Sequence, residues 1–159
     1  ELERATLYGD HVVIRWHSED VQPPYEVIFT SMMGEELGRY TTEQNWISVP
    51  VNEGKFKNES NLMVKVISKN KPGQGSKDYY IKKLKGKDRL EFDEKLKDAK
   101  TGKSALDQYV MAGVYEENFL LIDALNAYHE AATLAPDVEL YKTAYEEFVT
   151  RLEPVLGKD

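Results

Sequence analysis

Hydrophobic and polar residues alternate with a period of two through much of the first half of the chain. Residues 11–17 (HVVIRWH) place Val12, Ile14 and Trp16 on one side of an extended backbone. A β-strand with one buried face has this alternation. The same pattern predicts further strands at residues 24–30, 46–51, 62–68 and 77–84.

Turn-rich stretches containing Gly, Pro, Asn or Asp separate these strands, and no helical period occurs among them. Short strands divided in this way predict an antiparallel β-sandwich, here of about seven strands. Its core is expected to contain the inward-facing residues Tyr25, Val27, Phe29, Ile47, Val49, Val51, Leu62, Val64 and Val66.

The second half of the chain changes to a helical period. Tyr141, Ala144, Tyr145, Phe148 and Leu152 recur every third or fourth residue, which places them on one face of a helix. The same reasoning predicts helices near residues 88–99, 104–117, 119–134 and 137–152.

Two stretches resemble capping boxes, in which a side chain just before a helix binds a backbone N–H of its first turn. Asp88 with Glu91 is the stronger candidate. Ser104 with Asp107 is the weaker one, because Asp is shorter than the usual Glu or Gln.

The change of period near Gly86 predicts an α+β chain in two segregated parts. A β domain is expected over residues 1–86, and a helical domain of three to four helices over residues 87–159. Four lysines at the junction are expected to guard an edge strand and keep the junction soluble, with an acidic or lipid-surface partner as the alternative. These are Lys82, Lys83, Lys85 and Lys87.

Two motifs of the first half resemble a known family of domains. Trp16 closes a strand, a Pro-containing turn follows, and residues 25–29 (YEVIF) then alternate. Later, residues 66–76 lead from a strand into an Asn- and Gly-rich loop. In this order the motifs resemble a fibronectin type III domain over about residues 3–84, which implies an immunoglobulin-like sandwich. The family's tyrosine at the head of the penultimate strand is replaced by Leu62, so a looser immunoglobulin-like relative remains an alternative.

The helical half carries a second resemblance. Ala112, Ala124 and Ala131 would let two helix backbones approach closely, with Tyr128 between them and Pro136 ending the second helix. This spacing resembles one tetratricopeptide repeat of about 34 residues. No second copy is detected in the sequence, so the neighbouring helices are expected to act as caps.

Composition and charge argue against several classes of function. The net charge of −7 lies in the second half of the chain, where it would repel phosphate backbones, so nucleic acid is not an expected partner. Without cysteine there is neither a disulfide nor a thiolate metal ligand. No apolar run reaches the roughly 20 residues of a transmembrane helix. Because the chain starts at Glu1 without a methionine, we expect the native N-terminus and any signal peptide to be missing.

No residue pattern supports catalysis. His11 and His17 would lie roughly 20 Å apart along one strand, too far to bind one metal ion, and His129 stands alone on a helix. Adjacent acids such as Glu146 and Glu147 are expected to face solvent. The sequence contains no G-x-S-x-G, no H-E-x-x-H and no glycine-rich phosphate loop. We therefore expect no enzyme activity, no metal and no cofactor.

Four large side chains are the first candidate for a partner-binding site. Ile28, Met63 and Ile67 alternate outward on strands that should be neighbours, and Trp46 points away from the inward residues of its own strand. Something is expected to cover them, either the helical half of the chain or an external partner. Trp46 could alternatively stack on a sugar ring.

The predicted helix at residues 104–117 offers a second candidate surface. Tetratricopeptide proteins that grip a terminal carboxylate line this surface with basic and Asn side chains, which are missing here. A groove at this place would suit an apolar or basic segment instead. The residues at the corresponding positions are Tyr109, Val110, Gly113, Glu116 and Glu117.

The two resemblances together imply a non-catalytic protein-interaction or scaffolding module. Their combination resembles bacterial cell-envelope proteins, which predicts a periplasmic or cell-surface location and a protein partner. The alternative is a carbohydrate-binding or enzyme-associated accessory module of a secreted glycan-active protein, with Trp46 as the stacking platform. Fold analogy does not identify the partner.

Overall fold

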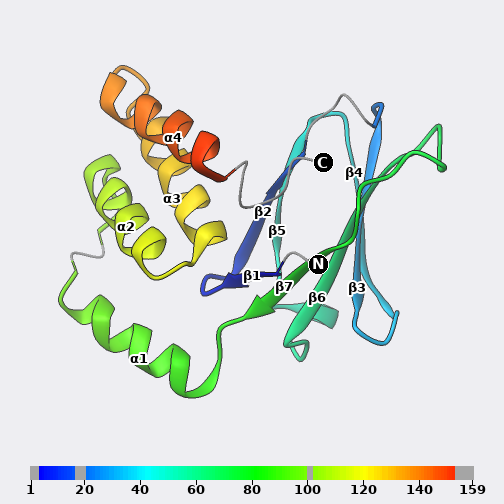
Figure 1. Cartoon of the computed structure of the whole chain (residues 1–159), viewed down its shortest axis with the longest axis horizontal. Coiled ribbons are helices and arrows are strands. Elements are labelled where there is room, and N and C mark those ends of the chain that lie inside the picture. Colours follow the sequence, from blue (N-terminus) through cyan, green and yellow to red (C-terminus); the bar gives the residue numbers. More distant parts are fainter. Residues whose placement is uncertain (1–3, 17–20, 100–101, 153–159) are drawn as a thin grey trace. The chain divides into compact units, whose positions relative to one another are not determined.

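The computed structural model describes residues 4–16, 21–99 and 102–152, and the chain divides into two compact units (Figure 1). The first unit spans Glu1–Lys83 and the second Leu84–Asp159. All strands of the described residues lie in the first unit and all four α-helices in the second. The predicted α+β class, with strands before helices, is confirmed.

The described part of the first unit contains seven strands in two sheets. The five-stranded sheet has the order β1-β7-β6-β3-β4, and the two-stranded sheet pairs β2 with β5. A short 3₁₀ helix, η1 (Gly54–Phe56), follows β5. The strands are β1 (Arg4–Leu7), β2 (His11–Arg15), β3 (Tyr25–Ser31), β4 (Glu36–Thr42), β5 (Trp46–Pro50), β6 (Asn61–Ser68) and β7 (Tyr79–Lys83).

The period-two pattern predicted most of the core residues of this unit. Every second residue of β3 and of β6 is buried, because successive side chains of a strand point to opposite faces. Ile14 and Ile47 are half-buried instead. The predicted core residues that are buried are Val12, Trp16, Tyr25, Val27, Phe29, Val49, Val51, Leu62, Val64 and Val66.

Two strands, β1 and β4, were not individually predicted. In β4 the alternation is interrupted by Gly38, where an added Cβ would lie 2.9 Å from the Tyr40 ring and 3.0 Å from the Phe56 ring. The two rings therefore leave little room for a side chain at this position. β1 has only four residues and pairs with β7 in parallel, so the antiparallel prediction is wrong for this pair.

Aromatic contacts and one lysine hold the segments of this unit together. The rings of Trp16 and Tyr25 meet edge to face at 5.1 Å, and those of Phe29 and Phe56 at 5.5 Å. Lys83 is buried, and its ammonium donates hydrogen bonds to the Val51 carbonyl oxygen and, at 2.6 Å, to that of Phe56.

The predicted edge-guarding role of the junction lysines is wrong for Lys82 and Lys83. Their strand, β7, lies between β1 and β6 and is not an edge of the sheet. A buried ammonium is tolerated only where it is paired or hydrogen-bonded, and the two carbonyl oxygens supply such bonds.

The helices of the second unit begin and end within two residues of their predicted bounds. They are α1 (Gly86–Lys97), α2 (Ala105–Glu117), α3 (Leu121–Leu134) and α4 (Glu139–Leu152). No helix in the described ranges is both long and apolar enough to cross a membrane.

Of the two predicted capping boxes, the weaker candidate is the one that forms. The Ser104 hydroxyl accepts a hydrogen bond from the Asp107 N–H, and the Asp107 carboxylate accepts one from the Ser104 N–H, both at 3.1 Å. The Asp88 box is wrong, because α1 begins two residues earlier at Gly86, whose φ is +61°. Asp88 therefore lies inside the first turn, where its charge still favours the helix dipole.

The small residues of α3 lie where two helices meet. Ala124 and Ala131 of α3 and Ala112 of α2 are fully buried, and α2 and α3 form the most extensive helix contact of this unit. α4 packs on α3 as well. The absence of large side chains at these positions allows the backbones to approach closely.

Candidate functional site

The face of the five-stranded sheet that is opposite its buried residues brings together three of the predicted partner-binding residues. We call it the outer sheet face. Ile28 on β3 lies between Arg39 of β4 and Lys65 of β6. On β6, Met63 is opposite Thr30 and Ile67 is opposite Glu26, so the three apolar side chains alternate with polar ones across two paired strands. Ile28, Met63 and Ile67 are all half-buried.

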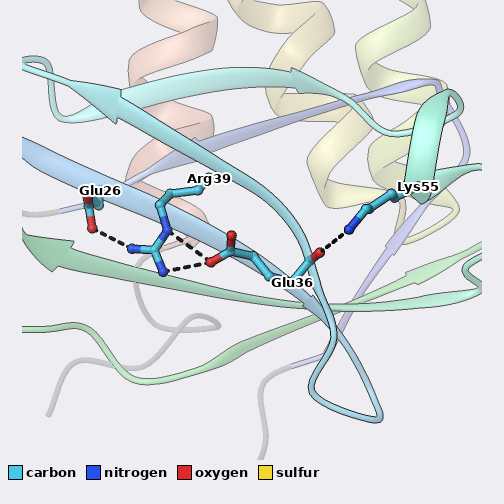
Figure 2. A network of polar contacts seen from close by, with 4 residues as sticks. All are labelled: Glu26, Glu36, Arg39 and Lys55. Atoms are coloured by element: carbon cyan, nitrogen blue, oxygen red, sulfur yellow. Dashed lines mark hydrogen bonds and ion pairs between the residues drawn. The ribbon is translucent and has the colours of Figure 1, made fainter.

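Arg39 forms a clamp with two acids on this face (Figure 2). Its Nη1 donates to Glu26 Oε2 at 2.7 Å, and its Nη2 and Nε donate to Glu36 Oε1 at 2.7 and 3.0 Å. The hydrogen bonds with Glu36 and then Glu26 raise the pKa of the Arg39 guanidinium. Because the guanidinium is planar and held from two sides, its orientation next to Ile28 is well defined.

Lys55 extends this polar network beyond the sheet to η1. Its ammonium donates to the Glu36 carbonyl oxygen at 3.4 Å (Figure 2). It also lies 3.6 Å from the Glu35 carboxylate. Exposed ion pairs contribute little to stability individually. The network therefore serves mainly to order charged side chains beside the apolar ones.

Trp46 does not belong to the outer sheet face. It opens β5 of the two-stranded sheet, where its register partner is Arg15 of β2. Its side chain is exposed, with a relative accessibility of 37%. Trp46, the sugar-stacking candidate, therefore lies in a different sheet from Ile28, Met63 and Ile67.

Tyr109, predicted to line a groove on α2, is instead part of an aromatic cluster. Its ring lies 6.3 Å from that of Tyr128 on α3 and 5.7 Å from that of Tyr141 on α4. Tyr128 in turn lies 4.9 Å from Phe148. The cluster joins three helices, so Tyr109 contributes to their packing.

Glu116 links the same three helices through polar contacts. Its carboxylate accepts a hydrogen bond from the Tyr128 hydroxyl at 3.0 Å and is bound by Arg151 Nη2 at 2.8 and 2.9 Å. Burial, followed by the hydrogen bond to Glu116, raises the pKa of Tyr128 to about 12. The residues of that predicted surface that stay exposed are Val110 and Glu117.

The sequence pattern predicted neither the Arg39 clamp nor the partner of Glu116. For Glu116 a usable signal existed, because Arg151 is one of only two basic residues between Asp107 and Glu153. A lone arginine among many acids is a reasonable partner for a half-buried carboxylate. For Arg39 no comparable signal existed, since its strand was not predicted.

No three His, Asp or Glu side chains among the described residues gather into a group that could hold a metal ion. His11 bonds Asp10 at 2.9 Å and thereby lowers the pKa of that carboxyl, and His129 meets Tyr145 edge to face. His17 lies outside the described residues.

Comparison with known proteins leaves the family of this chain open. No protein-family model matches the sequence, and no curated protein is similar enough to it to count as a relative. The function must therefore be argued from the residues themselves.

Proposed function

We propose that this chain is a non-catalytic protein-interaction or scaffolding module of a bacterial cell-envelope protein. In this proposal an immunoglobulin-like sandwich related to fibronectin type III domains precedes a tetratricopeptide-like helix pair, outside the cytoplasm. The partner is a protein.

The packing at the start of β3 supports the sandwich. Trp16, just after β2, packs edge to face on Tyr25, the first residue of β3. Ser76 braces the Asn- and Gly-rich loop, because its N–H donates to the Val66 carbonyl oxygen at 2.7 Å. The parallel pairing of β1 with β7 and the buried Leu62 favour a looser immunoglobulin-like relative over a strict fibronectin type III domain.

The buried alanines support the helix pair. Ala112, Ala124 and Ala131 have no exposed surface, and Tyr128 is buried with its hydroxyl donating to Glu116. α3 ends at Leu134, two residues before Pro136. These features support the proposed likeness to a tetratricopeptide repeat.

The observation that carries the proposed function is the outer sheet face. It combines three half-buried apolar side chains with an arginine whose orientation is fixed by Glu26 and Glu36. Met and Arg are enriched at protein interfaces, where apolar side chains are surrounded by a polar rim. The mixture therefore suits a protein contact.

A capture experiment with a matched pair of variants tests this proposal. Immobilised full chain is incubated with a native bacterial envelope fraction, and bound proteins are quantified. Ile28→Glu places a charge on the outer sheet face, and Ser48→Glu places one at an exposed position of β5. One partner should be depleted about tenfold or more by Ile28→Glu alone, since placing a charge where an apolar side chain would pack at an interface is costly.

Two controls make this result decisive. Far-UV circular dichroism must show that both variants remain folded. Equal capture by wild type and Ile28→Glu would contradict the proposal, as would the absence of any partner that the wild-type chain enriches over an unrelated bait.

The exposure of Trp46 favours a second candidate, binding of a glycan. The chain contains only two tryptophans, and the other, Trp16, is buried. Trp emission of Trp46→Phe therefore reports Trp16 alone. If glycans stack on Trp46, titration with polysaccharides changes wild-type emission but not that of the variant; unchanged emission across a glycan panel would rule out this candidate.

A further inference from the structure

The turn between β3 and β4 displays two adjacent methionines to solvent. Met33 has a relative accessibility of 95%, and Met32 of 51%. The other two methionines are shielded, because Met63 is half-buried on β6 and Met111 is buried in α2. The accessibility of the four methionines therefore decreases in the order Met33, Met32, Met63 and Met111.

Hydrogen bonds to Ser31 hold the conformation of this turn. Ser31 is buried, and its hydroxyl oxygen accepts hydrogen bonds from the N–H groups of Met33 and Glu35 at 3.2 and 3.1 Å. The Gly34 N–H donates to the Ser31 carbonyl oxygen at 3.0 Å, with a φ of +86° that favours glycine. These bonds involve backbone and Ser31 only, so they do not depend on the chemistry of the methionine side chains.

Sulfur chemistry in this chain is confined to methionine. There is no cysteine, and four methionines supply all the sulfur. A thioether is oxidised to the sulfoxide by two-electron oxidants such as hydrogen peroxide, and exposure controls which methionine reacts. Because the chain has no thiol that would react first, the most exposed thioether is expected to react fastest with the oxidant.

We propose that Met33 and Met32 form a site of preferential, reversible oxidation to methionine sulfoxide. In the step, a sulfur lone pair attacks one oxygen of hydrogen peroxide, an S–O bond forms, the O–O bond breaks, and after proton transfer water leaves. The sulfur is oxidised by two electrons and the peroxide is reduced. Methionine sulfoxide reductases reverse the step: two thiols are oxidised to a disulfide, and the sulfoxide oxygen leaves as water.

The consequence is a change of surface chemistry without a change of fold. A sulfoxide is polar, so the tip of the β3–β4 turn loses its apolar character. The hydrogen bonds that brace the turn remain available, since none of them uses a thioether. This chemistry does not depend on the proposed function.

A peroxide time course on the full chain tests the proposal. Hydrogen peroxide is added at neutral pH, aliquots are quenched, and fragmentation mass spectrometry assigns each sulfoxide to its residue. Met33 should react first and Met32 second, both at least about tenfold faster than Met111, with Met63 in between. Rates of Met33 and Met111 within about threefold of each other would overturn the proposal.

Unfolding and substitution provide the controls. In concentrated urea the four rates should converge, because the native differences come from burial alone. Met32→Leu/Met33→Leu should abolish the fast phase, whereas Met63→Leu should preserve it. A fast phase that persists in the double variant would contradict the assignment.

Two further readouts follow the oxidised protein itself. Its retention on a phenyl column should decrease, and treatment with methionine sulfoxide reductases should restore it. Its thermal midpoint should stay within about 1 °C of the reduced protein. A decrease of several degrees, or a lack of recovery by the reductases, would overturn the claim of a reversible surface modification.

Discussion

At the scale of single residues, Phe119 is in an unusual backbone conformation. It follows α2 with a φ of +59°, and its side chain is 80% exposed. This position after a helix is usually Gly, because a Cβ is strained in the left-handed region. Neither burial nor backbone preference explains a phenylalanine here.

Replacing this residue should stabilise the protein. Phe119→Gly is expected to raise the free energy of unfolding by about 1 kcal/mol, because it relieves the left-handed strain and removes no buried contact. Phe119→Ala, which keeps the Cβ, should gain much less. Urea denaturation of the three proteins measures this, and equal stability of the Gly and Ala variants would disprove the strain.

Tyr128 makes a pH-dependent contribution to stability. Its pKa is raised to about 12 in the folded protein, from an ordinary value of 10.0. The folded state therefore holds this proton more tightly than the unfolded state. The resulting stability is fully present below pH 10 and is lost as the pH rises from 10 towards 12.

Urea midpoints at pH 9 and pH 11 test this contribution. Between these values the wild type should lose about 1 kcal/mol more than Tyr128→Phe, which has no titratable hydroxyl. Each protein is compared with itself at the two pH values, and the two changes in unfolding free energy are then subtracted. The other tyrosines titrate in both proteins, so their effect cancels. The stability that Tyr128→Phe loses with the Glu116 hydrogen bond is already included in its value at pH 9. Parallel pH dependence would show that the hydroxyl titrates normally.

At the scale of secondary-structure elements, the start of α2 depends on its capping box. Ser104→Ala should destabilise the protein by about 1 kcal/mol, because it leaves the Asp107 N–H without its acceptor. Asp88→Ala, at the box that does not form, should cost less. Thermal denaturation distinguishes these outcomes, and a larger effect at Asp88 would contradict the observed caps.

Elements with an uninterrupted period were predicted most completely from the sequence. β3 and β6 alternate without a break, and α4 repeats its apolar stripe over three turns. β4 was missed because Gly38 interrupts its alternation, and one of the two rings that crowd this glycine, Phe56, is distant in sequence. The start of α1 was predicted two residues late, because the helix begins at Gly86, which has a positive φ, and not at Asp88.

At the scale of the whole molecule, the two compact units should respond to core mutations separately. Phe29 is fully buried and packs edge to face against Tyr40 and Phe56. Phe29→Ala should cost the first unit about 3–5 kcal/mol, the range for large-to-small core substitutions. Because the second unit has its own core, its helices should keep their protection.

Hydrogen exchange of the full chain measures this difference. In Phe29→Ala, amides of β3 and β6 should exchange faster while those of α2 and α3 remain at the wild-type rate. The reciprocal variant Phe148→Ala, at a buried position of α4, should accelerate the helices alone. Faster exchange throughout the chain in either variant would mean that the units unfold as one.

The candidate site was predictable only where it depends on strand parity. Parity put Ile28, Met63 and Ile67 on one face before any pairing was known, and the β3–β6 register then brought them together. The Arg39 clamp could not be found in this way. Arg39 and Glu36 lie in β4, which was not predicted, and Glu26 lies in the neighbouring strand β3.

The sequence by itself determined which face of β3 and of β6 is buried and where the chain changes from strands to helices. Both follow from local periodicity, since side-chain direction depends only on position along a strand or helix. Only the tertiary structure decided that β1 pairs in parallel with β7, that Lys83 is buried against the Val51 and Phe56 carbonyls, and that Glu116 binds Arg151. These depend on distant segments meeting in space, and a one-dimensional pattern does not contain that information.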